Sequence, residues 1–352
     1  MSGLYARVAR RPSRGHVRRV TPVPIEQADG LTAVVYGQVE RDFGMLAPPV
    51  SLHSPAPQVM AACWIVLRET LVAAGRVDRA TREAVAAAVS AVNSCPYCVE
   101  VHSATMAGLL GSATDPAGDT RRSRVAEWAR AGTDRSQARH AVPPVAAVEA
   151  VELLGVALVF HYLNRMVNVF LEPSPLPPGL PSVLRGGVRR VFGRLMARGA
   201  RGDRPAGAAQ ELLPAAPLTP DLAWSAGHPV LADALARGGA AIDAAGQRSV
   251  PGSVRELVTA RLDGWDGRPP GISRAWVGEA LRDLPAADHP AARLALLTAF
   301  ASYQVDDQVV ADVRAAGADD RALVELTAWA SMAAARRVAA WVPLDPAAPA
   351  SS

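Results

Sequence analysis

Apolar residues recur at helical spacing through long parts of this chain, which predicts two helix-rich blocks on either side of an irregular middle. The clearest segments are Arg79–Val92, an alanine-rich run of high helix propensity, and Val145–Phe170, a long apolar run. Runs of β-branched and aromatic residues, which favour strands, are sparse. The pattern therefore predicts an all-α protein.

The irregular middle covers residues 171–220, where proline and glycine are concentrated. Such a composition is typical of a linker. Within it, Ser182–Arg198 predicts a helix with arginines around most of its surface and apolar residues on one side: Leu184, Val188, Val191, Phe192, Leu195 and Met196. A basic amphipathic helix can lie on a membrane surface, but it more commonly packs on its own protein. We therefore predict a flexible basic arm (1–30), a first block (31–170), this linker and a second block (221–345).

The second block repeats the pattern of the first in a weaker form. Residues 293–314 resemble the segment that begins at Arg79, and residues 324–337 parallel residues 151–164. The second block has no cysteine, and no histidine after His289. We therefore predict two helical domains in tandem that pack together through apolar helices, the second being a degenerate copy of the first.

Composition and charge narrow the class of protein. With 352 residues, the chain is long enough for two domains. Its net charge is +4 and its acids are interspersed with arginines. Nucleic-acid binding needs basic residues concentrated on one surface, so we do not expect this function. We expect no integral membrane segment, because no run of about 18 apolar residues occurs, and no secretory signal, because the arginine-rich start lacks an apolar core. Three cysteines fit a reducing compartment, so we expect a cytoplasmic protein.

Residues 93–102, with the sequence NSCPYCVEVH, carry two of the three cysteines. Cys95, Cys98 and His102 are separated by three and four positions, so on a helix they share one face. Glu83 lies twelve residues before Cys95, in the alanine-rich helix. A short break between the two helices would let them fold back and bring Glu83 towards Cys95. A close thiol pair beside a base and a carboxylate is suited to thiolate redox chemistry.

The motif also predicts where its own helix begins. Asn93 or Ser94 can cap this helix, and Pro96 is tolerated only in its first turn. Both cysteines then lie near a helix N-terminus, where unpaired N–H groups and the macrodipole favour a thiolate over a thiol. We therefore expect the pKa of Cys98 to lie below the free-cysteine value of about 8.5.

Other uses of a cysteine pair fit the sequence less well. A zinc site needs four ligands, and the remaining cysteine, Cys63, lies alone in an apolar run. A c-type haem site needs histidine directly after the second cysteine, where Val99 stands. The cysteines could be small core residues, but Glu83 and His102 at helix-compatible offsets argue against this. His161, in the long apolar helix, is interpreted as a core residue. We expect no metal and no cofactor.

Glu83, the run Cys95-Pro-Tyr-Cys98 and His102, at these offsets, resemble the active-site signature of the carboxymuconolactone decarboxylase-like superfamily, and specifically its AhpD-like alkylhydroperoxidase branch. The close resemblance covers about residues 31–170. It implies that the two blocks are AhpD-like helical bundles and that the protein is a thiol peroxidase or disulfide reductase of antioxidant defence. The decarboxylase branch lacks the cysteine pair, so the name of the superfamily does not describe the activity expected here.

The resemblance also implies roles for individual residues. Cys98 is expected to attack the peroxide and become a sulfenic acid, and Cys95 to resolve it as a disulfide. Glu83 and His102 are expected to relay protons. An external dithiol, of the thioredoxin or lipoyl type, would then reduce the disulfide. Members of this family form homo-oligomers, so we expect the chain to associate with itself.

One position departs from the AhpD pattern. That branch has a second histidine just before the second cysteine, where this chain has Tyr97. The usual pKa of tyrosine, about 10, makes it a poor proton relay at neutral pH. Two other functions therefore stay open. One is a disulfide-exchange protein that reduces a separate peroxiredoxin, and the other is a non-catalytic helical interaction protein whose thiols sense oxidation.

The second block offers no equivalent site in any register that aligns the two copies. The place of Cys95 falls on residues 302–304, and the place of Glu83 falls on residues 290–292. These positions provide no thiol, no histidine and no acid where Glu83 should be. We therefore expect the second block to support the first without chemistry of its own.

Overall fold

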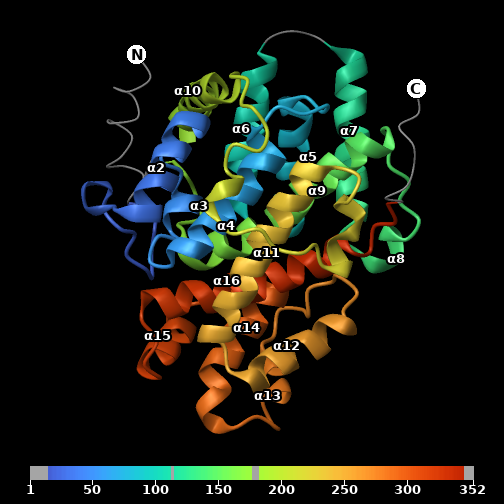
Figure 1. The fold of residues 1–352 in the computed structure, drawn as a ribbon. Coiled ribbons are helices and arrows are strands. Elements are labelled where there is room, and N and C mark those ends of the chain that lie inside the picture. The colour runs from blue at the N-terminus through green and yellow to red at the C-terminus, as the bar shows by residue number, and fades with distance from the viewer. Residues whose placement is uncertain (1–14, 112–114, 177–181, 345–352) are drawn as a thin grey trace.

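The computed structural model describes residues 15–111, 115–176 and 182–344, which form helices and turns without any strand (Figure 1). The prediction of an all-α protein is confirmed for this part of the chain. The first block contains η1 (Ile25–Gln27), α2 (Gly30–Phe43), α3 (Pro48–Ser51), α4 (Pro57–Leu67), η2 (Arg68–Val72), α5 (Arg79–Val92), α6 (Pro96–Leu110), α7 (Pro116–Ala131), α8 (Arg135–Ala138) and α9 (Ala147–Phe170).

The remaining helices begin inside the stretch predicted to be irregular and continue beyond it. They are α10 (Ser182–Ala200), η3 (Gln210–Leu212), η4 (Pro220–Ser225), α11 (Pro229–Ser249), α12 (Gly252–Asp263), α13 (Ala275–Ala280), η5 (Ala286–Asp288), α14 (His289–Ala301), η6 (Ser302–Gln304), α15 (Asp307–Ala315) and α16 (Asp320–Ala339). The second block begins at η4. The predicted helix Arg79–Val92 coincides with α5, and the predicted apolar helix Val145–Phe170 corresponds to α9.

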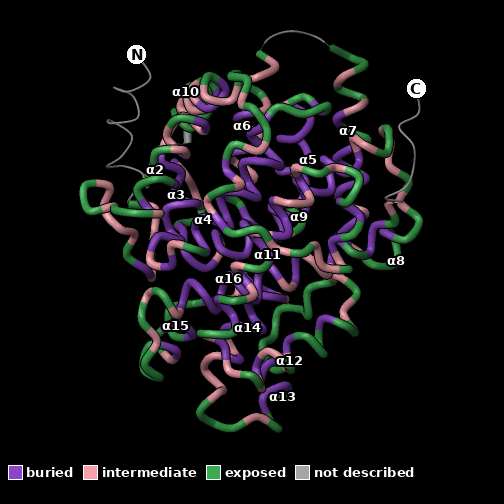
Figure 2. Tube along the Cα trace, viewed as in Figure 1, coloured by how far each residue is buried: buried purple, intermediate pink, exposed green. Residues whose placement is uncertain are grey.

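Apolar helices form the centre of the protein, where most of the buried trace in Figure 2 is gathered. In α4, every residue from Val59 to Leu67 is at most 4% exposed. Within the described residues, α9 is the single helix long and apolar enough to span a membrane, and 94% of its apolar window is buried inside the protein. The continuous apolar run of α9 is therefore that of a helix packed on all sides.

The two blocks pack against each other through pairs of long helices. α9 contacts α16, and α4 contacts α11. Hydrogen bonds that cross this interface include one from Ser331 Oγ to the carbonyl of Tyr162 at 2.7 Å and one from Arg165 Nε to the carbonyl of Ala299 at 3.0 Å. α5 packs on α9 as α14 packs on α16. The predicted packing of two helical copies is therefore present.

Residues 177–181 of the predicted linker lie outside the described residues, and much of the rest packs on the first block. α10 lies along α6 at very close range, since a Cβ on Gly108 would come within 2.2 Å of the carbonyl oxygen of Gly193. Further along, the backbone N–H of Gly207 donates to Glu69 Oε2 at 2.8 Å, and Arg68 Nη2 donates to the carbonyl of Pro205 at 3.0 Å. This proline- and glycine-rich segment is therefore held on the surface of the first block. Its irregular backbone is fixed by hydrogen bonds to side chains of that block.

The N-terminal arm is also held in part. Residues 1–14 of the predicted flexible arm lie outside the described residues. From there, the backbone N–H of Arg18 donates to the carbonyl of Phe170 at 2.8 Å, and the N–H of Glu172 donates to the carbonyl of His16 at 2.9 Å. An isolated β-bridge joins Val17 to Leu171. This strip fixes His16 beside the end of α9.

Candidate active site

The cysteine motif forms the turn between α5 and α6. Asp78 caps α5 by accepting a hydrogen bond from the backbone N–H of Thr81 at 2.9 Å. After α5, Ser94 adopts a left-handed conformation with φ of +51°, and the N–H of Cys95 donates to the carbonyl of Ser90 at 3.0 Å. These contacts reverse the chain so that α6 packs on α5. The predicted fold-back of the two helices is present.

The cap of α6 differs from the prediction. Cys95, rather than Asn93 or Ser94, is the N-cap residue, and its side chain makes no capping hydrogen bond. Ser94 is used for the turn itself, and Asn93 points towards α9, where its Nδ2 donates to Asn164 Oδ1 at 3.0 Å. Pro96 occupies the first turn, as predicted. The N–H groups of this first turn therefore have no side-chain cap from Cys95.

Glu83 and His102 form a buried pair. Nδ1 of His102 lies 2.6 Å from Oε2 of Glu83, and Arg79 Nε donates to Oε1 of Glu83 at 2.7 Å. Burial opposes the ionisation of Glu83, but Arg79 and His102 outweigh burial and hold its pKa below the ordinary value. The carboxylate is therefore ionised at neutral pH. It fixes the His102 ring, against which Phe160 packs edge-on with 4.4 Å between ring centroids.

Both motif cysteines are free thiols and are buried, Cys95 being 1% exposed and Cys98 2%. Burial and the neighbouring Cys95 raise the pKa of Cys98 well above its ordinary value, and a hydrogen bond with Asn164 lowers it by less. The predicted low pKa of Cys98 is therefore wrong for this resting thiol, because lost hydration outweighs the helix N-terminus. Burial also raises the pKa of Cys63, which lies inside α4.

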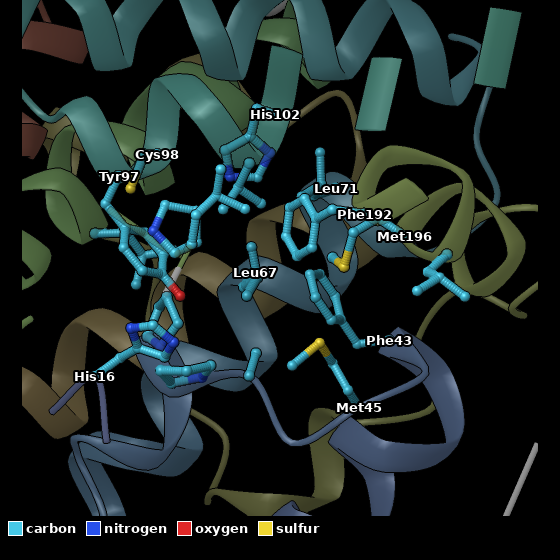
Figure 3. Close-up of a pocket in the computed structure, with 18 of the residues that line it drawn as sticks. His16, Phe43, Met45, Leu67, Leu71, Tyr97, Cys98, His102, Phe192 and Met196 are labelled. Carbon is cyan, nitrogen blue, oxygen red and sulfur yellow. The ribbon is translucent and has the colours of Figure 1, made fainter. Parts of the chain in front are cut away.

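A cavity of about 390 Å³ opens at Cys98 and His102 (Figure 3). Tyr97 and His16 add polar groups to it. Burial lowers the pKa of His16 and raises the pKa of Tyr97, so both side chains are uncharged at neutral pH. The walls are otherwise apolar and come from segments far apart in the sequence; they include Phe43, Met45, Leu67, Leu71, Phe192 and Met196.

Two parts of the cavity wall were not found by sequence reasoning. His16 belongs to the predicted flexible arm, and Phe192 and Met196 belong to α10, in the predicted linker. The apolar side of the amphipathic pattern indicated that this helix packs on its own protein, and it does. Nothing in the pattern indicated which surface the helix covers, because that depends on its contact with α6.

Amide side chains behind the motif tie the turn to α9. Asn164 Nδ2 donates to Ser90 Oγ at 2.9 Å, and its Oδ1 accepts from Asn93. Asn93 also lies 3.1 Å from Nδ1 of His161, and Asn168 Nδ2 donates to the carbonyl of Asn93 at 3.1 Å. Burial lowers the pKa of His161. It is therefore a neutral, hydrogen-bonded core histidine, which agrees with the prediction.

The matching turn in the second block lies between α14 and α15. The N-cap residue of α15 is Asp306, so by cap position Asp306 corresponds to Cys95 and Val309 to Cys98. Asp306 lies beyond residues 302–304, where the counterpart of Cys95 was predicted, because η6 adds a turn before α15. Counted back from the helix ends, Ala292 corresponds to Glu83. Across the described parts of the chain, no group of three or more histidine, cysteine or carboxylate side chains could hold a metal ion.

The chain is similar to known proteins in two ways. Residues 57–117, which span the cysteine motif, match the family described as the carboxymuconolactone decarboxylase family. Over 335 residues, the chain is 37% identical to the alkyl hydroperoxide reductase Rv2159c of Mycobacterium tuberculosis, covering 93% of this chain and 95% of that protein. The second similarity therefore extends over both blocks. Alike in motif, in helical architecture and along nearly its whole length, the chain belongs to the AhpD-like part of the carboxymuconolactone decarboxylase family.

Proposed function

We propose that this protein is a thiol peroxidase that reduces organic hydroperoxides at Cys98. The observation that carries the proposal is that Cys98 and His102 line one cavity, while Glu83 binds Nδ1 of the His102 ring and leaves Nε2 free of that contact. A sulfur, a proton acceptor and space for a substrate are thus close together. A relative that covers nearly the whole chain is named an alkyl hydroperoxide reductase, which supports a peroxide as the oxidant.

The walls of the cavity favour a hydroperoxide with an apolar group. A cavity of about 390 Å³ is at the small end of ligand sites, which hold about 300–1,000 Å³. Phenylalanine, leucine and methionine side chains face it, and Cys98 and His102 lie at one side (Figure 3). An alkyl or aryl group would fill the apolar part, leaving the O–O bond at the sulfur. Hydrogen peroxide would gain nothing from these walls.

The first step transfers a proton and then an oxygen. Because Nδ1 of His102 is bonded to Glu83, Nε2 is the nitrogen left to accept the proton of the Cys98 thiol. This base is needed because the pKa of Cys98 is raised by burial. The thiolate attacks the terminal peroxide oxygen, an S–O bond forms and the O–O bond breaks. The alcohol leaves with the proton from His102, and Cys98 becomes a sulfenic acid.

The second step uses Cys95. Its sulfur attacks the sulfur of Cys98, the S–O bond breaks, and hydroxide leaves with the Cys95 proton as water. The product is a Cys95–Cys98 disulfide, so the two electrons given to the peroxide come from the two thiols. An external dithiol then returns two electrons and two protons. Tyr97, whose pKa is raised by burial and by both cysteines, keeps its proton throughout, so it can form hydrogen bonds but does not relay a proton.

Rapid mixing of the reduced full-length protein with cumene hydroperoxide and with hydrogen peroxide tests the proposal. We expect two thiols to be lost per protein, with faster loss for cumene hydroperoxide, and continued turnover when dithiothreitol is present. Cys63→Ser is the matched control, since Cys63 is buried in α4 away from the cavity lining. Oxidation without turnover would favour a redox sensor, and peroxide consumption that persists in Cys98→Ser would rule out the proposed nucleophile.

A further inference from the structure

Two different openings reach the cysteine pair. Among the described residues, Cys98 lines the apolar cavity, and Cys95 does not. Cys95 instead lines a shallow groove of about 460 Å³ on the outer side of α6, together with Glu100, Ser103 and Arg189. The cysteine that meets the peroxide and the cysteine that resolves it therefore line separate spaces.

The groove at Cys95 continues into a strongly basic one between α6 and α10. This second groove, of about 630 Å³, shares Ser103 and Arg189 with the first. We call it the arginine groove, because five arginines and no acid line it: Arg189, Arg190, Arg194, Arg198 and Arg201. All five are exposed, so the expectation that basic residues are not concentrated on one surface is wrong at this groove. Within the described part of the chain, none of them forms an ion pair, so their charge is free for a partner.

The crossing of α6 and α10 holds this groove in shape. Gly108 and Gly193 let the two backbones touch, and a Cβ on Gly193 would come within 2.3 Å of the carbonyl of Ala104. Arg201 Nη2 also donates to the carbonyl of Gly108 at 3.1 Å. Positions 190, 194 and 198 are spaced by four, so their side chains leave one face of α10. The opposite side of α10 supplies Phe192 and Met196 to the peroxide cavity.

We propose that the arginine groove docks an acidic protein that carries a reducing dithiol and presents it to Cys95. This inference rests on the proposed function, because it needs a Cys95–Cys98 disulfide. A donor thiolate attacks the sulfur of Cys95, a donor–Cys95 bond forms, and Cys98 leaves as a thiolate. The second donor thiol then attacks the donor sulfur and releases Cys95. The donor becomes a disulfide, and its two thiol protons end on Cys95 and Cys98.

Charge complementarity selects this partner over other anions. Five unpaired arginines attract any acidic surface within a Debye length of about 10 Å at 0.1 M salt, and such steering raises association rates by about 10 to 1,000 times. Through Ser103 and Arg189 the groove adjoins the one that Cys95 lines, and Cys95 is the cysteine that the donor attacks in this proposal. A nucleic acid or an anionic membrane would match the charge but would bring no thiol to Cys95.

The test compares two dithiol peptides on the oxidised full-length protein. Both contain the same Cys-x-x-Cys segment; one is flanked by aspartate and glutamate, the other by asparagine and glutamine. We expect the acidic peptide to reduce the disulfide about tenfold faster at low salt, with the advantage shrinking as salt rises. The double variant Arg194→Glu with Arg198→Glu should remove the advantage. Arg124→Glu with Arg130→Glu, on exposed positions of α7, is the matched control and should keep it.

Three results would overturn the docking surface. The first is an equal rate of disulfide reduction by the two peptides on the unchanged protein. The second is an equal loss of the acidic peptide's rate advantage in the α7 control. The third is tight binding of single-stranded RNA or anionic vesicles without faster reduction by the acidic peptide. Dithiothreitol separates this failure from a failure of the proposed function. If dithiothreitol reduces the disulfide but charge has no effect, the groove proposal is wrong; if peroxide never forms the disulfide, the proposed function is wrong.

Discussion

The two blocks have similar helix order but differ at the turn between their paired helices. In the second block, Asp306 caps α15 in the ordinary way, accepting a hydrogen bond from the N–H of Val309 at 3.0 Å. In the first block, Cys95 stands at the cap of α6 without a side-chain hydrogen bond. A polar N-cap is worth about 1 kcal/mol. The first block thus gives up this local stabilisation, and a sulfur stands where the capping oxygen would be.

The pairs of helices also differ in what they bury. Between α5 and α6, the ionised Glu83 is fully buried and held by Arg79 and His102. At the corresponding place in α14, Ala292 is buried among apolar side chains. Burying a charge is costly unless it is paired and hydrogen-bonded. At this pair of positions, the first copy buries a paired charge and the second copy buries an apolar side chain.

The largest expected effect comes from removing the proposed nucleophile, Cys98. Cys98→Ser should abolish peroxide turnover, and Cys95→Ser should allow one oxidation and leave a sulfenic acid that dimedone labels. Adding thiols to the second block of the Cys98→Ser protein, by Asp306→Cys and Val309→Cys, should not restore activity. The second block has no residue that corresponds to Glu83 or His102. Recovered turnover in that protein would break the contrast between the blocks.

The next effect concerns proton transfer. Glu83→Gln and His102→Gln should each slow the reaction of Cys98 with cumene hydroperoxide by about 100-fold, the usual scale for a positioned acid or base. The matched control is Glu325→Gln, which removes a buried, ion-paired acid from the second block. It should change stability but not this rate. Stopped-flow thiol loss measures the rate, and a full rate in Glu83→Gln would remove the proposed relay.

A third prediction concerns stability at low pH. His228, backbone N–H groups and Arg82 outweigh burial and lower the pKa of Glu152 on α9 to about 2. Because this pKa is lowered in the folded state, its stabilisation is fully present above the unfolded value of about 4.3 and is lost as pH falls towards 2. Glu152→Gln should reduce the unfolding free energy at pH 7 by about 3 kcal/mol. Urea unfolding measures this change.

The pH dependence of the unfolding free energy distinguishes the effect of the Glu152 charge from the effect of its side-chain packing. The native protein should lose stability between about pH 4.5 and pH 2, and Glu152→Gln should lose less over the same range. Glu325, at the matching position of α16, has a pKa lowered by Arg248, Ser249 and Arg321 against burial. Glu325→Gln should change in the same direction. A pH dependence that is the same with and without Glu152 would contradict the assignment.

The smallest expected effect concerns the cavity wall that α10 supplies. Phe192→Ala should weaken the reaction with cumene hydroperoxide about tenfold, since burying a large apolar side chain is worth about 1.5–3 kcal/mol. The reaction with hydrogen peroxide should not change. Phe300→Ala, which removes an aromatic side chain packed on Trp265 and Trp276 in the second block, is the control. An equal loss of rate with both peroxides would show that Phe192 does not contact the organic group of the substrate.

The helices of the site were readable from local sequence. The alanine-rich run Arg79–Val92 became α5 without a change of bounds, and the spacing of Cys98 and His102 put them on one buried side of α6. The sequence also indicated that Glu83 would return to this region. These features depend on residues within one helical hairpin, so propensity and spacing predict them well.

An all-α chain, two related blocks and a thiol motif with Glu83 and His102 near it could be predicted from the sequence alone. The tertiary structure alone decided what surrounds that motif. It placed His16 and α10 over the cavity, used Cys95 as the cap of α6, and raised the pKa of Cys98 by burial. The physical reason is that cavity walls and pKa shifts arise from desolvation and contacts between distant segments, which no local pattern of residues records.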